Sequence, residues 1–161
     1  MREIATRAGV GTLYRHFPNR SDLVTAVFRR EVDACAAAAV TLAIEHVSGE
    51  ALARWLHRYT NFIATKCGLA AALHSGDPAF DALPAYFRRH LEPALKALLD
   101  SAVVAGVVPS DVEPYDLLRA VASLCTPGHD VGPDHARRMV DLLIDGLRHG
   151  AAQPGPARPR E

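Results

Sequence analysis

Apolar residues recur at intervals of three and four along most of the chain, which is the spacing of one buried face of an α-helix. The longest pattern begins at Asn19 or Ser21, either of which is a typical helix N-cap residue, and continues to about Val47. Similar patterns occupy residues 50–67, 85–105, 115–125 and 134–149. Alternation of the strand type is nearly absent, so the sequence predicts an all-α fold.

Glycine and proline mark where these helices should begin and end. Gly106 and Gly150 follow two of the patterns and are expected to terminate them. Pro114 suits the first position of a helix. Pro93 falls within a helix and predicts a bend there, because proline lacks the backbone donor. Residues 68–84 contain two glycines and two prolines and are expected to form a looser connection.

Composition and length narrow the class of protein. The chain has 161 residues, of which 49% are hydrophobic and 22% charged, as expected for one compact soluble domain, either alone or with a small appendage. No apolar run approaches the roughly 20 residues of a membrane span, and the first residues lack the apolar centre of a signal peptide. Three widely spaced cysteines are typical of reduced thiols, so we expect a cytoplasmic protein that does not associate with a membrane.

The formal net charge is zero, but the charges are unevenly distributed. Residues 1–30 carry six arginines against two acidic residues, and the other 131 residues carry 12 basic and 16 acidic side chains. A basic end on an acidic body is typical of a segment that binds a polyanion such as DNA. A solvated basic helix face would have the same composition, and the charge pattern alone does not separate the two interpretations.

Residues 2–27 have the layout of a helix-turn-helix. Residues 2–8 and 12–17 each predict a short helix, and a glycine-containing turn separates them. Four residues of the second helix have side chains suited to DNA: Thr12, Tyr14, Arg15 and His16. Hydroxyl, phenol and imidazole groups can bind phosphate oxygens, and arginine can do so or read guanine.

Two phrases in this segment, REIATRAGV and GTLYRHFPNRSDL, resemble the DNA-binding end of the TetR family of bacterial transcriptional regulators. A later phrase, WLHRYTNFIATKCGLAAAL, looks like the ligand domain of one TetR subgroup. The resemblance implies a head of three DNA-binding helices, a long fourth helix that leads into an effector-binding core, and two last helices that pair two subunits. It divides the chain into a partial helix-turn-helix region (1–20), a helical ligand-binding and dimerisation domain (21–150) and a proline-rich tail expected to be disordered (151–161).

The resemblance also implies which side chains contact DNA. Thr12, Tyr14 and His16 would lie along the DNA-facing side of the recognition helix, and Arg2 and Arg20 would neutralise phosphates. The full set of candidate DNA-binding residues is Arg2, Thr12, Leu13, Tyr14, Arg15, His16 and Arg20. Each neutralised phosphate makes binding more sensitive to salt.

The sequence departs from the family pattern in two places. The family has a helix before REIATRAGV, whereas this sequence begins in the second helix. The family also has two more residues between AGV and GTLYRHF, where the recognition helix contacts base edges. Two functions therefore stay open. One is a ligand-responsive regulator, expected to be a repressor, that binds operator DNA as a homodimer. The other is a truncated relative, deficient in DNA binding, that acts as a small-molecule-binding or dimerisation module.

Aromatic side chains suggest a binding site for a small effector. Trp55, Tyr59 and Phe62 are spaced four and three apart, so they share a helix face. With residues of later helices, the candidate ligand-binding set is Trp55, Tyr59, Phe62, Phe80, Tyr86, Phe87 and His90. Apolar walls with a few polar tips suit a small apolar or amphipathic ligand. A filled core would show the same stripe, and the spacing does not distinguish the two.

The last two predicted helices are more apolar than two surface helices need. One face could pack on the body and the other on a second copy, which would form a four-helix bundle between subunits. The candidate interface residues are Leu117, Val121, Leu124, Met139, Leu143 and Leu147. The alternative is that both helices complete the core of a monomer, and the resemblance favours the homodimer.

Signals for catalysis and metal binding are weak. A cysteine and two histidines between residues 125 and 135 have spacings that match no standard zinc site. His57 with Asp81, or His74 with Asp77, could be drawn as acid–base pairs, but no nucleophile motif or glycine-rich phosphate loop accompanies them. We therefore expect no enzyme activity, no metal and no cofactor.

Overall fold

The structure is a computed structural model that describes residues 19–67, 77–125 and 134–152. Its elements are α3 (Arg20–Glu45), α4 (Ser48–Cys67), the 3-10 helix η1 (Pro78–Phe80), α6 (Leu83–Val104), α7 (Pro114–Leu124) and α8 (His135–Ala152). The described residues contain no strand, and the predicted all-α fold is confirmed. None of the described helices is long and apolar enough to cross a membrane.

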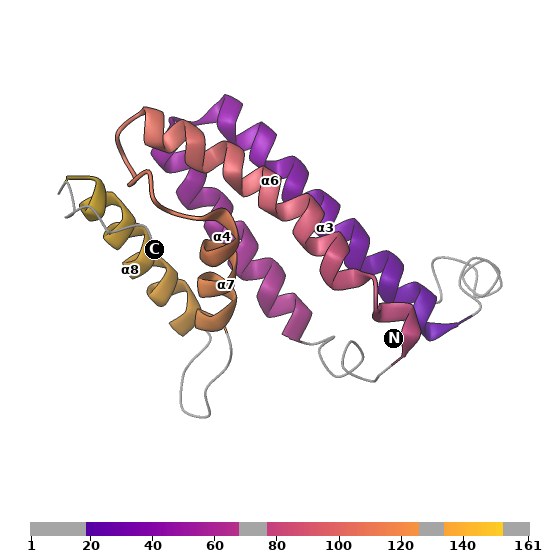
Figure 1. Ribbon diagram of the computed structural model, residues 1–161. Coiled ribbons are helices and arrows are strands. Elements are labelled where there is room, and N and C mark those ends of the chain that lie inside the picture. The colour runs from indigo at the N-terminus through magenta and orange to yellow at the C-terminus, as the bar shows by residue number, and fades with distance from the viewer. Residues whose placement is uncertain (1–18, 68–76, 126–133, 153–161) are drawn as a thin grey trace, which may run out of the picture.

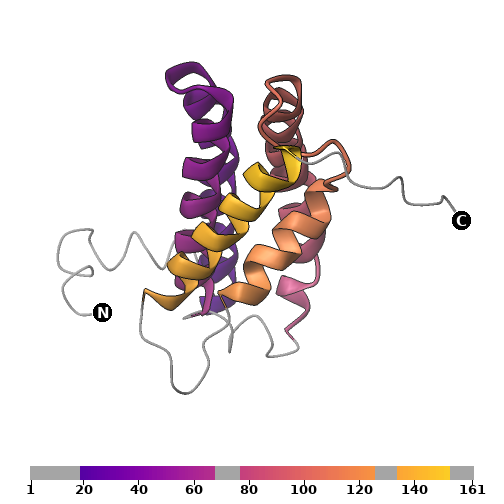
Figure 2. The ribbon, with the colours of Figure 1, turned by 90° about the vertical axis from the view of Figure 1, so that its left-hand side faces the viewer.

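The two long helices α3 and α6 lie side by side and point the same way, and α4 returns antiparallel to them (Figure 1). Hydrogen bonds at both ends help to hold the helices in this arrangement. At one end Ser21 of α3 bonds to Asp77, and at the other the hydroxyls of Ser48 on α4 and Ser101 on α6 are 2.8 Å apart. The shorter helices α7 and α8 lie beside each other across one side of these three (Figure 2). The fold is therefore one helical body with α3 as its longest helix.

The predicted helix boundaries at Gly106 and Pro114 are confirmed. Gly106 has a φ of 70°, a backbone conformation that glycine adopts without steric cost. Its N–H donates to Val103 and the N–H of Val107 donates to Ala102, which is the Schellman arrangement that ends a helix. Pro114 is the first residue of α7, as predicted. These bonds satisfy carbonyl groups that the last turn of α6 would otherwise leave open.

Two predictions of helix ends need correction. Gly150 does not end the last helix, because it lies within α8, which continues to Ala152. Asn19 occupies the N-cap position of α3, but its side chain makes no capping bond, and the Ser21 hydroxyl bonds to Asp77 rather than to its own helix. Pro93 lies within α6 (Leu83–Val104), as the sequence predicts. Pro93 is on an exposed face, where water can bond the carbonyl that loses its partner, so the helix tolerates it.

One stripe of α3 is buried between α4 and α6. Its members are Val24, Phe28, Val32, Cys35 and Ala39, at helical spacing. The indole N–H of Trp55 on α4 donates to the Cys35 carbonyl at 2.9 Å, and both side chains are buried. Burial raises the pKa of the Cys35 thiol to about 12, so this cysteine is a protonated packing residue.

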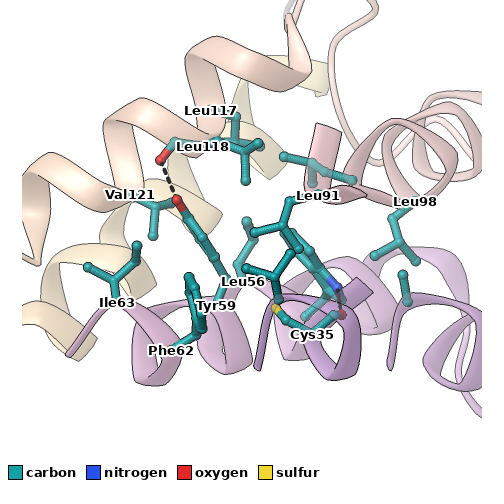
Figure 3. Close-up of a cluster of buried hydrophobic side chains, with 14 of the residues drawn as sticks. Cys35, Leu56, Tyr59, Phe62, Ile63, Leu91, Leu98, Leu117, Leu118 and Val121 are labelled. Carbon is teal, nitrogen blue, oxygen red and sulfur yellow. Dashed lines mark hydrogen bonds between the residues drawn. The ribbon is translucent and has the colours of Figure 1, made fainter. Parts of the chain in front are cut away.

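The core is centred on the aromatic face of α4 (Figure 3). Trp55 and Tyr59 have no exposed surface, and their rings stack with centroids 5.6 Å apart. The Tyr59 hydroxyl donates to the Leu118 carbonyl of α7 at 3.3 Å, which supplies a partner for a buried polar group. Burial raises the pKa of Tyr59 above its usual range, so the phenol keeps its proton. Tyr59 thus links α4 to α7.

We predict that Tyr59→Ala lowers the free energy of unfolding by about 3–5 kcal/mol, because it leaves a cavity in a packed core. Tyr59→Phe keeps the ring and removes only the bond to Leu118, so we expect a loss of about 1 kcal/mol. Chemical denaturation followed by circular dichroism measures both values. If Tyr59 lined an empty cavity instead, the alanine variant would lose no more than the phenylalanine variant.

Candidate functional site

The structure places one of the candidate DNA-binding residues. Arg20 is the first residue of α3, and its side chain is exposed. The others lie outside the described residues: Arg2, Thr12, Leu13, Tyr14, Arg15 and His16. An exposed arginine at the start of the long helix is free to contact a phosphate, which is the role that the sequence predicts for Arg20.

The first turn of α3 is attached to the core through η1. The Ser21 hydroxyl donates to Asp77, and Asp77 also accepts the N–H of Ala79 at 3.0 Å, which caps η1. Both hydrogen bonds hold the pKa of Asp77 below its ordinary value, and the bond from Ser21 has the larger effect. Asp77 therefore joins α3 to η1. Its predicted partner His74 lies outside the described residues.

A second polar contact joins α3 to α6. The Tyr86 hydroxyl donates to Asp33 at 2.7 Å, and this bond raises the pKa of Tyr86. The His90 ring stacks on the Tyr86 ring at 4.0 Å, and its Nδ1 lies 2.8 Å from the Tyr86 carbonyl oxygen. The guanidinium of Arg29 lies 5.1 Å from the Tyr86 ring centroid. Tyr86 and His90, two of the candidate ligand-binding residues, thus belong to a contact between helices.

The other candidate ligand-binding residues pack on one another or on the core. Phe62 lies 6.1 Å from both Tyr59 and Phe87 between ring centroids, and Phe80 is buried in η1. The sequence analysis missed Phe28 of α3, whose ring lies 5.9 Å from that of Phe62. Its place on the apolar face of the longest helix is the signal that could have found it. The aromatic side chains fill space here, so a ligand among them would have to displace them.

An open cavity of about 770 Å³ lies on another face of the molecule, away from the aromatic cluster. Its walls come from α3, α4 and the first turn of α8. The lining residues are Ala34, Ala37, Ala38, Thr41, Leu42, Arg54, His57, Arg58, Thr60, Asn61 and Arg137. We call this cavity the α3–α4–α8 groove. None of the candidate ligand-binding residues lines it.

Two of the four basic side chains that line the groove have an acidic partner. Arg54 forms an ion pair with Glu50 at 2.6 Å, and the pKa of Glu50 is lowered by that hydrogen bond. His57 lies 3.0 Å from Asp141 of α8, so the acid–base pair drawn between His57 and Asp81 is not the one that forms. Exposed ion pairs of this kind contribute little stability. Arg54 and His57 nevertheless each have an acidic partner.

The candidate interface residues fall into two groups. Leu117, Val121 and Leu147 face the chain's own body: the first two are buried, and Leu147 lines a small space against α4. A buried side chain such as Val121, with no exposed surface, cannot contact a second copy without repacking. The other members are Leu124, Met139 and Leu143, which are half-buried as Leu147 is, and of these Leu124 and Leu143 also pack against the core. Leu142, which the sequence analysis did not select, has 63% of its surface exposed on α8.

Comparisons with known proteins cover both ends of the chain. Residues 48–149 match the family described as "Transcriptional regulator SbtR-like, C-terminal domain". Residues 1–27 match "Bacterial regulatory proteins, tetR family". No curated protein matches the chain.

A solved structure extends the similarity to the whole fold. The TetR transcriptional regulator SCO0520 from Streptomyces coelicolor is 35% identical in sequence, and its crystal structure superposes with a TM-score of 0.76. The match covers 91% of this chain and 86% of that chain. The helices described above, with α3 leading from the matched DNA-binding segment into the body, fit this relationship. The chain belongs to the TetR family of bacterial transcriptional regulators.

Proposed function

We propose that this transcriptional regulator is a repressor that binds operator DNA as a homodimer and responds to a small molecule. The observation that carries the proposal is the continuity of α3. This helix begins at Arg20, inside the segment (residues 1–27) that matches the TetR DNA-binding region, and it extends 26 residues to Glu45 in the body. A helix of that length spans about 39 Å, so a small change of tilt in the core would displace its DNA-proximal end.

The contacts of α3 support a response to ligand. Ser21 is bonded to Asp77 and Asp33 to Tyr86, so α3 is attached to η1 and α6 by polar bonds at two levels. A ligand that binds one arrangement of these helices better than another would shift the population toward it. Two DNA-binding segments in a dimer would then lose the spacing that matches two half-sites.

The outer face of α8 supports the homodimer. Leu142 is largely exposed there, and Gly146 follows four residues later, one turn along the helix. A protruding leucine beside a residue without a side chain suits close packing of two helices. The interface that we propose therefore centres on Leu142, with the half-buried Leu124, Met139 and Leu143, and leaves Leu117 and Val121 in the core.

Operator binding is tested by fluorescence anisotropy of the full chain on its own upstream intergenic DNA and on a scrambled duplex. We predict saturable binding that prefers the native duplex. Arg20→Gln should weaken it and reduce the slope of log K against log salt by about one per subunit, because one phosphate contact is lost. Arg30→Gln, an exposed arginine further along α3, is the matched control and should change the slope less.

The outcome also separates the two functions that the sequence left open. If the chain binds both duplexes equally and salt abolishes this binding, the interaction is non-specific attraction between arginine and phosphate. No binding by a folded dimer would favour a small-molecule-binding or dimerisation module. The shorter spacing between AGV and GTLYRHF is the feature of the sequence that supports this second function.

We predict that Leu142→Glu converts the dimer into a monomer, because it places a charge at the centre of the proposed interface. Size-exclusion chromatography with light scattering measures the mass, and circular dichroism checks that the helices persist. Val40→Glu on α3 is the control, since Val40 is exposed to a similar extent, 66% against 63% for Leu142. A Leu142→Glu protein with the mass of the wild type would refute this interface.

We predict that Asp77→Ala lowers the Tm, and that its effect depends on pH. The folded pKa of Asp77 lies below the ordinary value of 3.8, so its bonds contribute stability above that pH and lose it as the pH falls through the folded pKa. The Tm difference from the wild type should be largest near neutral pH and shrink below about pH 4. Asp81→Ala, an exposed aspartate beside η1, is the control. A Tm difference that stays constant with pH would contradict the role of the carboxylate.

A further inference from the structure

We propose that the α3–α4–α8 groove is a binding site for a small amphipathic carboxylate, a molecule with one carboxylate and one apolar chain. The site is separate from the aromatic cluster, and its test does not require that the chain binds DNA. Its volume of about 770 Å³ falls within the range of roughly 300–1,000 Å³ that is usual for small-molecule pockets.

The shape of the groove comes from small side chains on α3. Ala34, Ala37, Ala38 and Thr41 recur at intervals of three or four and so line one face of that helix. Larger residues at these positions would close the space against α4. Together with Leu42 they form an apolar wall, which an alkyl chain or an aromatic ring can cover but a compact polar ion cannot use.

The charge of the groove comes from two arginines, Arg58 and Arg137. Among the described residues, neither Arg58 nor Arg137 lies within ion-pair distance of a carboxylate. The bond that Arg58 makes to the Ala34 carbonyl is long, at 3.4 Å, and a guanidinium has five N–H donors. Both side chains therefore retain donors that face the groove or the surrounding water.

A carboxylate is the group that matches these donors. Guanidinium binds carboxylate through charge-assisted and often bidentate hydrogen bonds, and the excess positive charge would repel a cationic head group. Arg54 and His57 do not add to this excess, because each is paired with an acidic side chain, Glu50 and Asp141 respectively. The apolar wall on α3 and the guanidinium groups of Arg58 on α4 and Arg137 on α8 then accommodate the two halves of one amphipathic molecule.

The test is isothermal titration calorimetry of the full chain with dodecanoate, and with dodecylammonium as the probe of equal chain length and opposite charge. We expect one saturable dodecanoate site per subunit and much weaker binding of dodecylammonium. The double variant Arg58→Gln, Arg137→Gln should weaken dodecanoate binding by at least about tenfold. Lys96→Gln removes a positive charge from α6, outside the groove, and should leave the affinity unchanged.

A second variant tests the shape independently of the charge. Ala37→Phe places an aromatic ring in the groove at an exposed position, where it should fold normally and block dodecanoate. Ala43→Phe, an exposed alanine on the same helix outside the groove, is the matched control. The proposal is overturned if the wild type does not bind dodecanoate. It is also overturned if dodecylammonium binds equally well, or if neither the double variant nor Ala37→Phe weakens binding.

Discussion

The burial of one stripe of α3 between α4 and α6 determines how the rest of the structure is arranged. Val32 and Cys35 of that stripe are almost completely buried, and the Trp55 indole bonds to the Cys35 carbonyl. Full burial of a side chain such as Val32 contributes on the order of 1.5–3 kcal/mol. Since α3 also carries Arg20 at its start, the packing that holds the core together also fixes the position of this candidate DNA-binding residue.

The filled aromatic core changes where a ligand can bind without reorganisation of the protein. Trp55 and Tyr59 have no exposed surface, and their rings stack on each other. A ligand in that region would therefore have to separate two packed rings. The open volume lies instead along the alanine-rich face of α3. The small side chains on α3 leave open space, whereas the large aromatic side chains fill the space around them. Apolar spacing in the sequence does not reveal this difference.

The helices could be predicted from the sequence because each follows from local chemistry. Apolar spacing identifies the buried stripe of α3, and Gly106 and Pro114 act through the backbone of their own turns. The contacts between helices could not be predicted, because they depend on how elements far apart in sequence meet. Periodicity shows that Tyr86 lies on a helix, but not that its hydroxyl reaches Asp33, 53 residues away. It likewise cannot tell a residue such as Val121, buried within one chain, from one buried between two.

The position of the groove links ligand binding to the two helices on which the proposed function depends. One of its walls is α3, which continues to Arg20, and another is α8, which carries Leu142 on its exposed face. A carboxylate held by Arg58 of α4 and Arg137 of α8 would tie these helices together while its apolar part rests on α3. Any movement of α3 against that wall would change the contacts of the ligand. By linkage, the ligand must then favour one position of α3 over another.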